Sequence, residues 1–274
     1  MLDLAQKAAN TSSAIYTVSE AARLCVLSQG RVRRWAKGYS FRRGTEIRNS
    51  PPVVQTPHRV GERGAIGLDF LDLIEIRYVK AFIEAGVSWQ VLRTAHARAA
   101  AMLHADHPFA TKKFYTDGQT ILAKLAEPPL LDIIRNQFVF SQMLDRYLAG
   151  GEGLDFDKQD LALRWWPMGR KGLVVIDSER SFGQPIVSIE GVPTAVLNRA
   201  YVAESGSVDE EQPGEEWTPD GPKPARVIRF ELPTAEPKRR FERLAIGRVA
   251  GWFGVEKRSV RAAIEYESDF LDAA

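Results

Sequence analysis

The sequence has few of the residues that disulfides, membrane spans and export signals require. Cys25 is the single cysteine, so no internal disulfide can form, and we expect its thiol to pack inside a helix. No run approaches the roughly eighteen apolar residues that cross a membrane. The first residues lack the basic start and apolar segment of a signal peptide. We therefore expect a cytoplasmic protein with no membrane partner.

Recognisable catalytic patterns are also missing. The sequence contains no phosphate-binding glycine loop and no nucleophile with a base in a familiar local context. The four histidines, His58, His96, His104 and His107, have no spacing that indicates a metal site. We therefore predict no catalytic residue, no metal and no cofactor, and a protein that is not an enzyme.

Charge is distributed unevenly along a chain whose net charge is only +2. Residues 1–60 hold ten basic and three acidic side chains, whereas residues 204–220 hold seven acidic and no basic ones. A basic end favours an anionic partner such as nucleic acid, although solvated faces that balance each other would also explain the pattern.

Residues 17–38 have the pattern of a helix-turn-helix. Thr17 or Ser19 can cap a first helix, and Ser28 can cap a second one over residues 29–37, which Gly38 ends. Val32 and Trp35 give this second helix an inward stripe, and its basic residues point outward. A short cationic second helix is what docking into the major groove requires. The residues that we expect at DNA are Ser28, Gln29, Arg31, Arg33, Arg34 and Lys37.

The next segments continue a plausible DNA-binding unit. Residues 50–70 alternate short β-prone pieces with Pro and Gly, as a hairpin wing would. A helix with the stripe Leu71, Ile74, Tyr78 and Phe82 follows. Gly86 interrupts it, and Ser88 caps another helix that begins at Trp89.

Residues 14–103 resemble the winged helix of MerR-type regulators. The matching residues are Val18 to Ala22, Ser28, Arg33, Trp35 and the segment Glu84 to Ser88. The resemblance implies that Arg33 contacts phosphate, that Gln29, Arg31 and Arg34 lie at or near the groove, and that His58 and Arg59 of the wing flank the backbone. The sequence departs from the family at the Arg-x-Tyr wing signature and in lacking the long dimerisation helix.

The middle of the chain reads as short hairpins around one helix. Phe114 and Tyr115 begin a predicted hairpin that turns at Asp117-Gly118. Residues 130–148 predict an amphipathic helix, and residues 161–177 a further hairpin in which Trp165 and Trp166 are more readily explained as core than as a ligand cage.

The C-terminal part predicts a second helix-turn-helix. Thr194 is expected to cap a helix after a strand-rich segment, and residues 253–255 to form the turn between two later helices. Ala245, Val249 and Ala250 face inward. Three basic residues lie on the expected exposed side of the last helix, where we expect them to bind DNA or to form a dimer face: Lys257, Arg258 and Arg261.

The segments "SFGQPIV", "VPTAV" and "VRAAIEYE" resemble a family of small helix-turn-helix antitoxins. When the MerR-like N-terminal region is included, nearly all of residues 14–267 resembles a VapB-type antitoxin. Residues 205–238 interrupt that pattern and are rich in Pro and Glu, which predicts a flexible insert.

This resemblance implies an antitoxin of a type II system that neutralises a PIN-domain ribonuclease toxin and binds its own operator DNA, as a homodimer or a larger complex with the toxin. The acidic residues 204–220 would then compete for basic RNA-binding residues of the toxin. The alternative is a MerR-like transcription regulator that senses a small ligand through its middle region and has no toxin.

We predict a mainly α (α+β) fold with a MerR-like winged helix, a small mixed middle region with short hairpins and a C-terminal helix-turn-helix domain. The expected divisions are a flexible start at 1–13, the winged helix at 14–105, the connecting region at 106–175, the antitoxin-like domain at 176–267 and a tail at 268–274.

Overall fold

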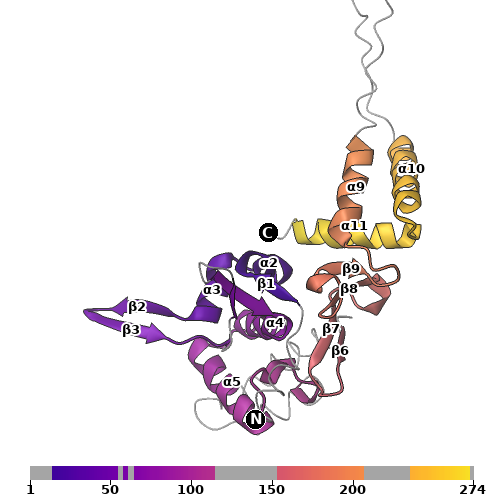
Figure 1. The fold of residues 1–274 in the computed structure, drawn as a ribbon. Helices are drawn as coiled ribbons and strands as arrows, with labels where there is room; N and C mark the ends of the chain where they lie inside the picture. Colours follow the sequence, from indigo (N-terminus) through magenta and orange to yellow (C-terminus); the bar gives the residue numbers. More distant parts are fainter. Residues whose placement is uncertain (1–13, 55–57, 61–64, 115–152, 207–234, 272–274) are drawn as a thin grey trace, which may run out of the picture.

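The computed structural model describes residues 14–54, 58–60, 65–114, 153–206 and 235–271. Helices dominate these residues and small sheets connect them, so the mainly α fold with an N-terminal helix-turn-helix is confirmed (Figure 1). No helix in the described ranges is both long and apolar enough to cross a membrane. The predicted helix over residues 130–148, the Asp117-Gly118 turn and residues 207–220 of the acidic segment lie outside the described residues.

The N-terminal unit opens with β1 (Ile15–Thr17), α2 (Val18–Leu24) and α3 (Gln29–Lys37). Thr17 is the N-cap of α2, and the Glu20 side chain reaches back to the Thr17 amide at 2.7 Å in a reciprocal capping box. Val26, with φ of 51°, turns the chain, and Ser28 then caps α3 by accepting from the Arg31 amide. These local signals explain why the two helices begin and end where the sequence predicted.

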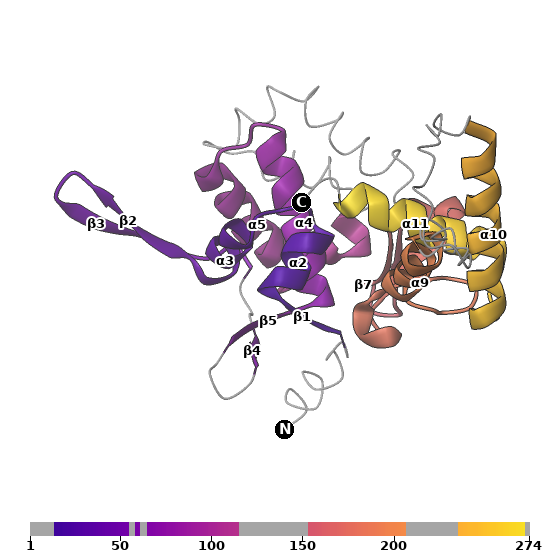
Figure 2. The same cartoon turned by 90° about the horizontal axis from the view of Figure 1, so that it is seen from above.

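Two hairpins follow α3, where the sequence had predicted one. Strands β2 (Tyr39–Arg43) and β3 (Glu46–Ser50) form a separate two-stranded sheet. The predicted wing corresponds to β4 (His58–Val60) and β5 (Ala65–Asp69), which pair antiparallel, and β1 joins the other edge of β5. The hairpins project in different directions from α3 (Figure 2).

Helices α4 (Phe70–Glu84) and α5 (Trp89–Leu103) form the core of this unit. Gly86 and the Ser88 cap separate them as predicted. The buried face of α4 is wider than the predicted apolar stripe, because it also includes the polar residues Asp72, Glu75 and Arg77. The Glu75 carboxylate lies 2.9 Å from Nε2 of His96 on α5 and also accepts from the Phe109 amide at 2.8 Å. A buried acid thus joins α4, α5 and the 3-10 turn η1 (Pro108–Ala110).

The predicted strand at Phe114 is wrong. Residues 112–114 are helical, and the Thr111 hydroxyl accepts from the Phe114 amide at 3.1 Å. The Phe114 ring packs against Phe109 and Tyr78 in the core of the N-terminal unit. Tertiary packing of this aromatic side chain therefore overrides the local β preference.

A four-stranded antiparallel sheet connects the N- and C-terminal parts of the chain. It contains β6 (Gly153–Phe156), β7 (Ala162–Trp166), β8 (Val174–Asp177) and β9 (Pro185–Val187) in that order. The predicted β7–β8 hairpin is confirmed, and Trp165 is buried while Trp166 is half-buried. The expected domain boundary between residues 175 and 176 falls inside β8. The sheet is thus one structural element shared by two of the expected domains.

Helices α9 (Thr194–Gly206), α10 (Ala235–Phe253) and α11 (Lys257–Leu271) pack on the β8–β9 end of the sheet. Ala245, Val249 and Ala250 are buried as predicted. Thr194 is the first residue of α9 rather than the capping residue before it, and its hydroxyl donates to Oε1 of Glu267 on α11 at 2.6 Å. The insert is also shorter than predicted, because residues 205–206 belong to α9 and residues 235–238 to α10.

The C-terminal unit contacts the helix-turn-helix directly. The Tyr16 hydroxyl of β1 donates to the carbonyl of Gly183 at 3.0 Å, in the 3-10 turn η3 (Ser181–Gly183). Arg23 of α2 lies 3.5 Å from Oε2 of Glu267. The guanidinium of Arg77 stacks over Trp165 with its carbon 4.6 Å from the ring centroid. Both units are therefore held at one relative orientation.

Cys25 is buried, as the sequence predicted, but it is the C-cap of α2 and not a residue inside the helix. Burial raises the pKa of its thiol to about 12. The thiolate is the reactive form, so the folded protein should react with iodoacetamide at pH 8 about a thousandfold more slowly than the urea-unfolded chain. Mass spectrometry of timed samples measures both rates. Equal rates would show that the thiol is accessible in the native fold.

Candidate nucleic-acid interface

The helix-turn-helix presents one cationic face to solvent. Val32, Trp35 and Ala36 of α3 are buried against the core, whereas the polar residues of the helix are exposed. Trp35 is fixed by stacking on Trp89 of α5, with ring centroids 5.9 Å apart. The exposed residues of α3 are Gln29, Gly30, Arg31, Arg33, Arg34 and Lys37. This helix contains no acidic residue, so every charge on its outer face is positive.

The side chains on this face differ in how they are held. The Gln29 amide donates to the Ser19 hydroxyl on α2 at 3.2 Å, which orients it near the start of α3. Nε of Arg34 donates to the carbonyl of Gly30 at 3.3 Å. No ion pair involving Arg31, Arg33 or Lys37 is found among the residues that the structure describes. These three charges are available to an anionic partner.

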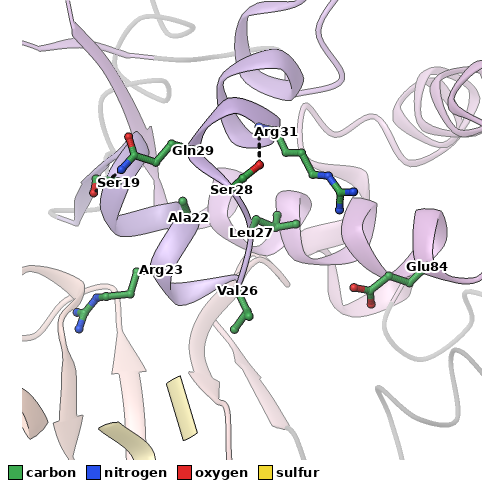
Figure 3. A pocket seen from close by; sticks show the side chains of 9 residues that line it. All are labelled: Ser19, Ala22, Arg23, Val26, Leu27, Ser28, Gln29, Arg31 and Glu84. Carbon is green, nitrogen blue, oxygen red and sulfur yellow. Dashed lines mark hydrogen bonds between the residues drawn. The ribbon is translucent and has the colours of Figure 1, made fainter. Parts of the chain in front are cut away.

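An open hollow lies at the start of α3, between α2 and the end of α4 (Figure 3). Arg23 borders it from α2 and Arg31 from α3, while Glu84 at the end of α4 adds one acidic group. The amides at the start of α3 add partial positive charge beside it. Its lining residues are Ser19, Ala22, Arg23, Val26, Leu27, Ser28, Gln29, Arg31 and Glu84.

The two wing residues expected at the backbone lie on β4. His58 pairs with Gly67 of β5, and Arg59 pairs with Ile66. The β4–β5 hairpin projects from the same side of the unit that carries β1, apart from the β2–β3 hairpin (Figure 2). The structure thus places a hairpin where the sequence expected the wing.

The second basic group lies at the start of α11. Lys257, Arg258 and Arg261 are all exposed, but Arg258 forms an ion pair with Glu256. The Glu190 carboxylate accepts from the Glu256 amide at 2.8 Å and from the Ser259 hydroxyl, so an acid already covers the start of this helix. The face is therefore less positive than that of α3.

Three potential metal ligands lie within 4.8 Å of one another: Asp69 of β5, Asp72 of α4 and His107, which precedes η1. Asp69 and Asp72 accept from each other's amides at 2.8 and 3.0 Å, which is a reciprocal cap at the start of α4. Helix capping thus accounts for the two carboxylates, and Nδ1 of His107 lies 3.7 Å from Oδ1 of Asp72. The spacing of the histidines had not indicated this cluster.

Comparison with known proteins supports a DNA-binding helix-turn-helix. Residues 14–96 match a family described as "Putative DNA-binding HTH domain". The chain is 28% identical over 196 residues to a Mycobacterium tuberculosis protein named "Putative antitoxin VapB45", an alignment that covers 66% of this chain and 80% of that relative.

The fold is also similar to a solved structure. The crystal structure of Rv2018 from Mycobacterium tuberculosis superposes with a TM-score of 0.56 at 20% identity, and the match covers 91% of this chain and 96% of the other. This likeness shows that the arrangement of elements extends over almost the whole chain.

Proposed function

We propose that the protein is an antitoxin that binds operator DNA through α3 and neutralises a PIN-domain ribonuclease toxin. The observation that carries the DNA-binding half is the cationic outer face of α3, whose buried Trp35 and capped start hold the helix ready for a major groove. The similarity to a protein named as an antitoxin supports the other half. We also propose the division into a winged helix, a connecting region and an antitoxin-like domain as the functional units.

Within this proposal the basic residues have two roles. Arg33, Lys37 and the wing residues His58 and Arg59 bind phosphates and position the protein. Gln29, Arg31 and Arg34 lie at or near the groove, where Gln29 and Arg31 reach base edges at the start of α3. Ser28 orients that start as its cap. Lys257, Arg258 and Arg261 form a second face for DNA or for a dimer.

Replacing Arg33 with alanine should weaken binding to every DNA sequence by a similar factor. One lost phosphate contact lowers the slope of log K against log salt by about 0.9. Replacing Gln29 or Arg31 should instead reduce the preference for operator over random DNA, by about 1–3 kcal/mol for a base-reading side chain. Titrations at several salt concentrations measure both quantities. Arg243→Ala, which removes an exposed arginine of α10, is the matched control; equal losses from all four variants would contradict the division of roles.

The partner-binding half of the proposal is supported by an exposed apolar stripe on α10. Phe241, Leu244 and Trp252 recur at helical spacing and are 48%, 52% and 63% exposed. Large apolar side chains exposed on one side of a helix favour a protein interface.

Replacing Trp252 with alanine should weaken the toxin complex at least tenfold, because buried tryptophans dominate interface energies. The test co-expresses the chain with the product of the neighbouring gene and places a tag on that product only. Light scattering then measures the molar mass of the complex that is eluted from the affinity column. Phe182→Ala, which removes a 79% exposed aromatic side chain on η3, is the control. If the wild-type chain forms no complex with the neighbouring gene's product, and that product alone does not arrest growth, the toxin-binding proposal is wrong. The protein would then be a MerR-like regulator without a toxin.

A further inference from the structure

The β2–β3 hairpin, which the sequence had not predicted, projects from the body immediately after α3 (Figures 1 and 2). We call residues 39–50 the β-arm. Every side chain described between Tyr39 and Asn49 is exposed. An isolated two-stranded hairpin is only marginally stable in water, so an arm of this kind gains most from a surface to lie against.

The base of the β-arm is fixed to α3 and α5. Nε1 of Trp89 donates to the Ser50 hydroxyl at 3.0 Å, and the Val53 amide donates to the carbonyl of Trp35 at 3.0 Å. Gly38 lies so close to β3 that a Cβ there would be 2.5 Å from the carbonyl oxygen of Ser50. The direction of the β-arm is therefore set relative to the cationic helix.

One face of the β-arm continues the cationic face of α3. Residues directly opposite each other in an antiparallel pair share a face, and Phe41 is opposite Arg48. The Phe41 ring is 5.8 Å from that of Tyr39, and the guanidinium carbon of Arg34 on α3 lies 5.9 Å from the Tyr39 centroid. Cationic and aromatic side chains thus extend from the helix onto one face of the β-arm, from Arg34 through Tyr39 and Phe41 to Arg48.

The β-arm is also basic in sequence. It holds Arg42, Arg43 and Arg48 against the single acid Glu46, which pairs with Arg48 at 3.1 Å. Two basic arms from two copies of the chain would repel each other if they paired edge to edge. An anionic surface suits this composition better than a second copy does.

We propose that the β-arm binds the duplex DNA that flanks the site of α3. This inference rests on the proposed DNA binding by α3. Five residues of extended strand reach about 17 Å, which exceeds the roughly 12 Å width of the major groove. When α3 lies in that groove, the arm crosses the flanking phosphate backbone, where Arg48 neutralises a phosphate and Tyr39 and Phe41, on the same face of the arm, pack on sugars at the neighbouring minor groove.

The test compares hydroxyl-radical footprints and salt-dependent affinities on operator DNA. One variant replaces residues 40–49 by Asn-Gly, which closes the hairpin next to the Tyr39–Ser50 pair, and a second is the point variant Arg48→Ala. Both should lose flanking protection, keep the protection at the site of α3 and bind more weakly at 0.15 M salt, the deletion variant at least tenfold. The salt slope should fall by about 0.9 in Arg48→Ala, since one phosphate contact is lost. If the deletion variant does not fold, the point variant, whose exposed side chain is not needed for folding, still gives the result.

The control Arg243→Ala should leave the footprint unchanged. A full-length footprint in both arm variants, together with weaker binding by Arg33→Ala, would overturn the role of the β-arm and leave DNA binding by α3 intact. No binding by the wild-type chain would overturn the proposed function itself. A change from dimer to monomer in the deletion variant, with no change in the flanking footprint, would show that the arm binds a second copy instead.

Discussion

Gly183→Ala is expected to destabilise the protein by about 3 kcal/mol. Gly183 has φ of 72°, where a residue with a Cβ pays roughly 1–2 kcal/mol. A Cβ there would also lie 2.1 Å from the Tyr16 hydroxyl and 2.5 Å from Cβ of Ala14. Relieving such an overlap costs about 1–3 kcal/mol more and moves β1 away from η3.

Thermal and urea unfolding measure this effect, and we expect the melting midpoint to fall by about 10 °C. Gly254→Ala is the matched control, because Gly254 has φ of 62° but a Cβ there would meet nothing within 4 Å. The difference between the two variants isolates the contact between β1 and η3. Equal midpoints for both would show that this contact contributes nothing to stability.

Glu75→Ala should destabilise the N-terminal unit by about 3–5 kcal/mol, the cost of removing one partner from a buried ionisable pair. The Glu75 side chain is fully buried, and its loss leaves the His96 ring and the Phe109 amide without their shared acceptor. Unfilled space at the junction of α4, α5 and η1 adds to the loss.

Glu75→Gln is the informative companion variant. Glutamine keeps the shape and one acceptor oxygen, so it can still accept from the Phe109 amide, and we expect it to lose only about 1 kcal/mol. Urea unfolding followed by tryptophan fluorescence measures both variants. If Glu75→Gln were as destabilised as Glu75→Ala, the charge of the carboxylate, rather than its hydrogen bonds, would be the source of stability.

Elements with local signals were predictable from the sequence. The caps at Thr17, Ser28 and Ser88, and the break at Gly86, depend on residues a few positions apart, and the structure has helices at those places. The same holds for the cationic face of α3, since helical periodicity alone separates Arg31 and Arg34 from the buried Trp35.

The β-arm was missed although it has a signal. Two β-prone segments flank the two-residue turn Gly44-Thr45, which is typical of a tight hairpin. Its residues were assigned no element because the wing was expected after residue 50. The Glu75–His96 pair had no such signal, because a carboxylate in a helical pattern is normally solvated, and only the fold brings residues 21 positions apart into contact.

The long-range contacts between the two units were outside the reach of any pattern. Nothing local to Thr194 distinguishes a helix cap from a hydroxyl that meets Glu267, and the position of α11 decides between them. The expected domain boundary between residues 175 and 176 falls inside β8 for a similar reason. β8 pairs with β7 on one side and β9 on the other, and local sequence does not show this pairing.

The contact of Tyr16 with Gly183 and that of Arg23 with Glu267 have a consequence for how such proteins diversify. Each contact joins residues more than 160 positions apart, so a gene that exchanged its first half with a distant relative would inherit only one side of both. A functional chimera would have to carry compatible residues at positions 16 and 183, and at 23 and 267. Descent should therefore preserve these pairs together, and recombination between diverged copies should succeed only where the pairs still match.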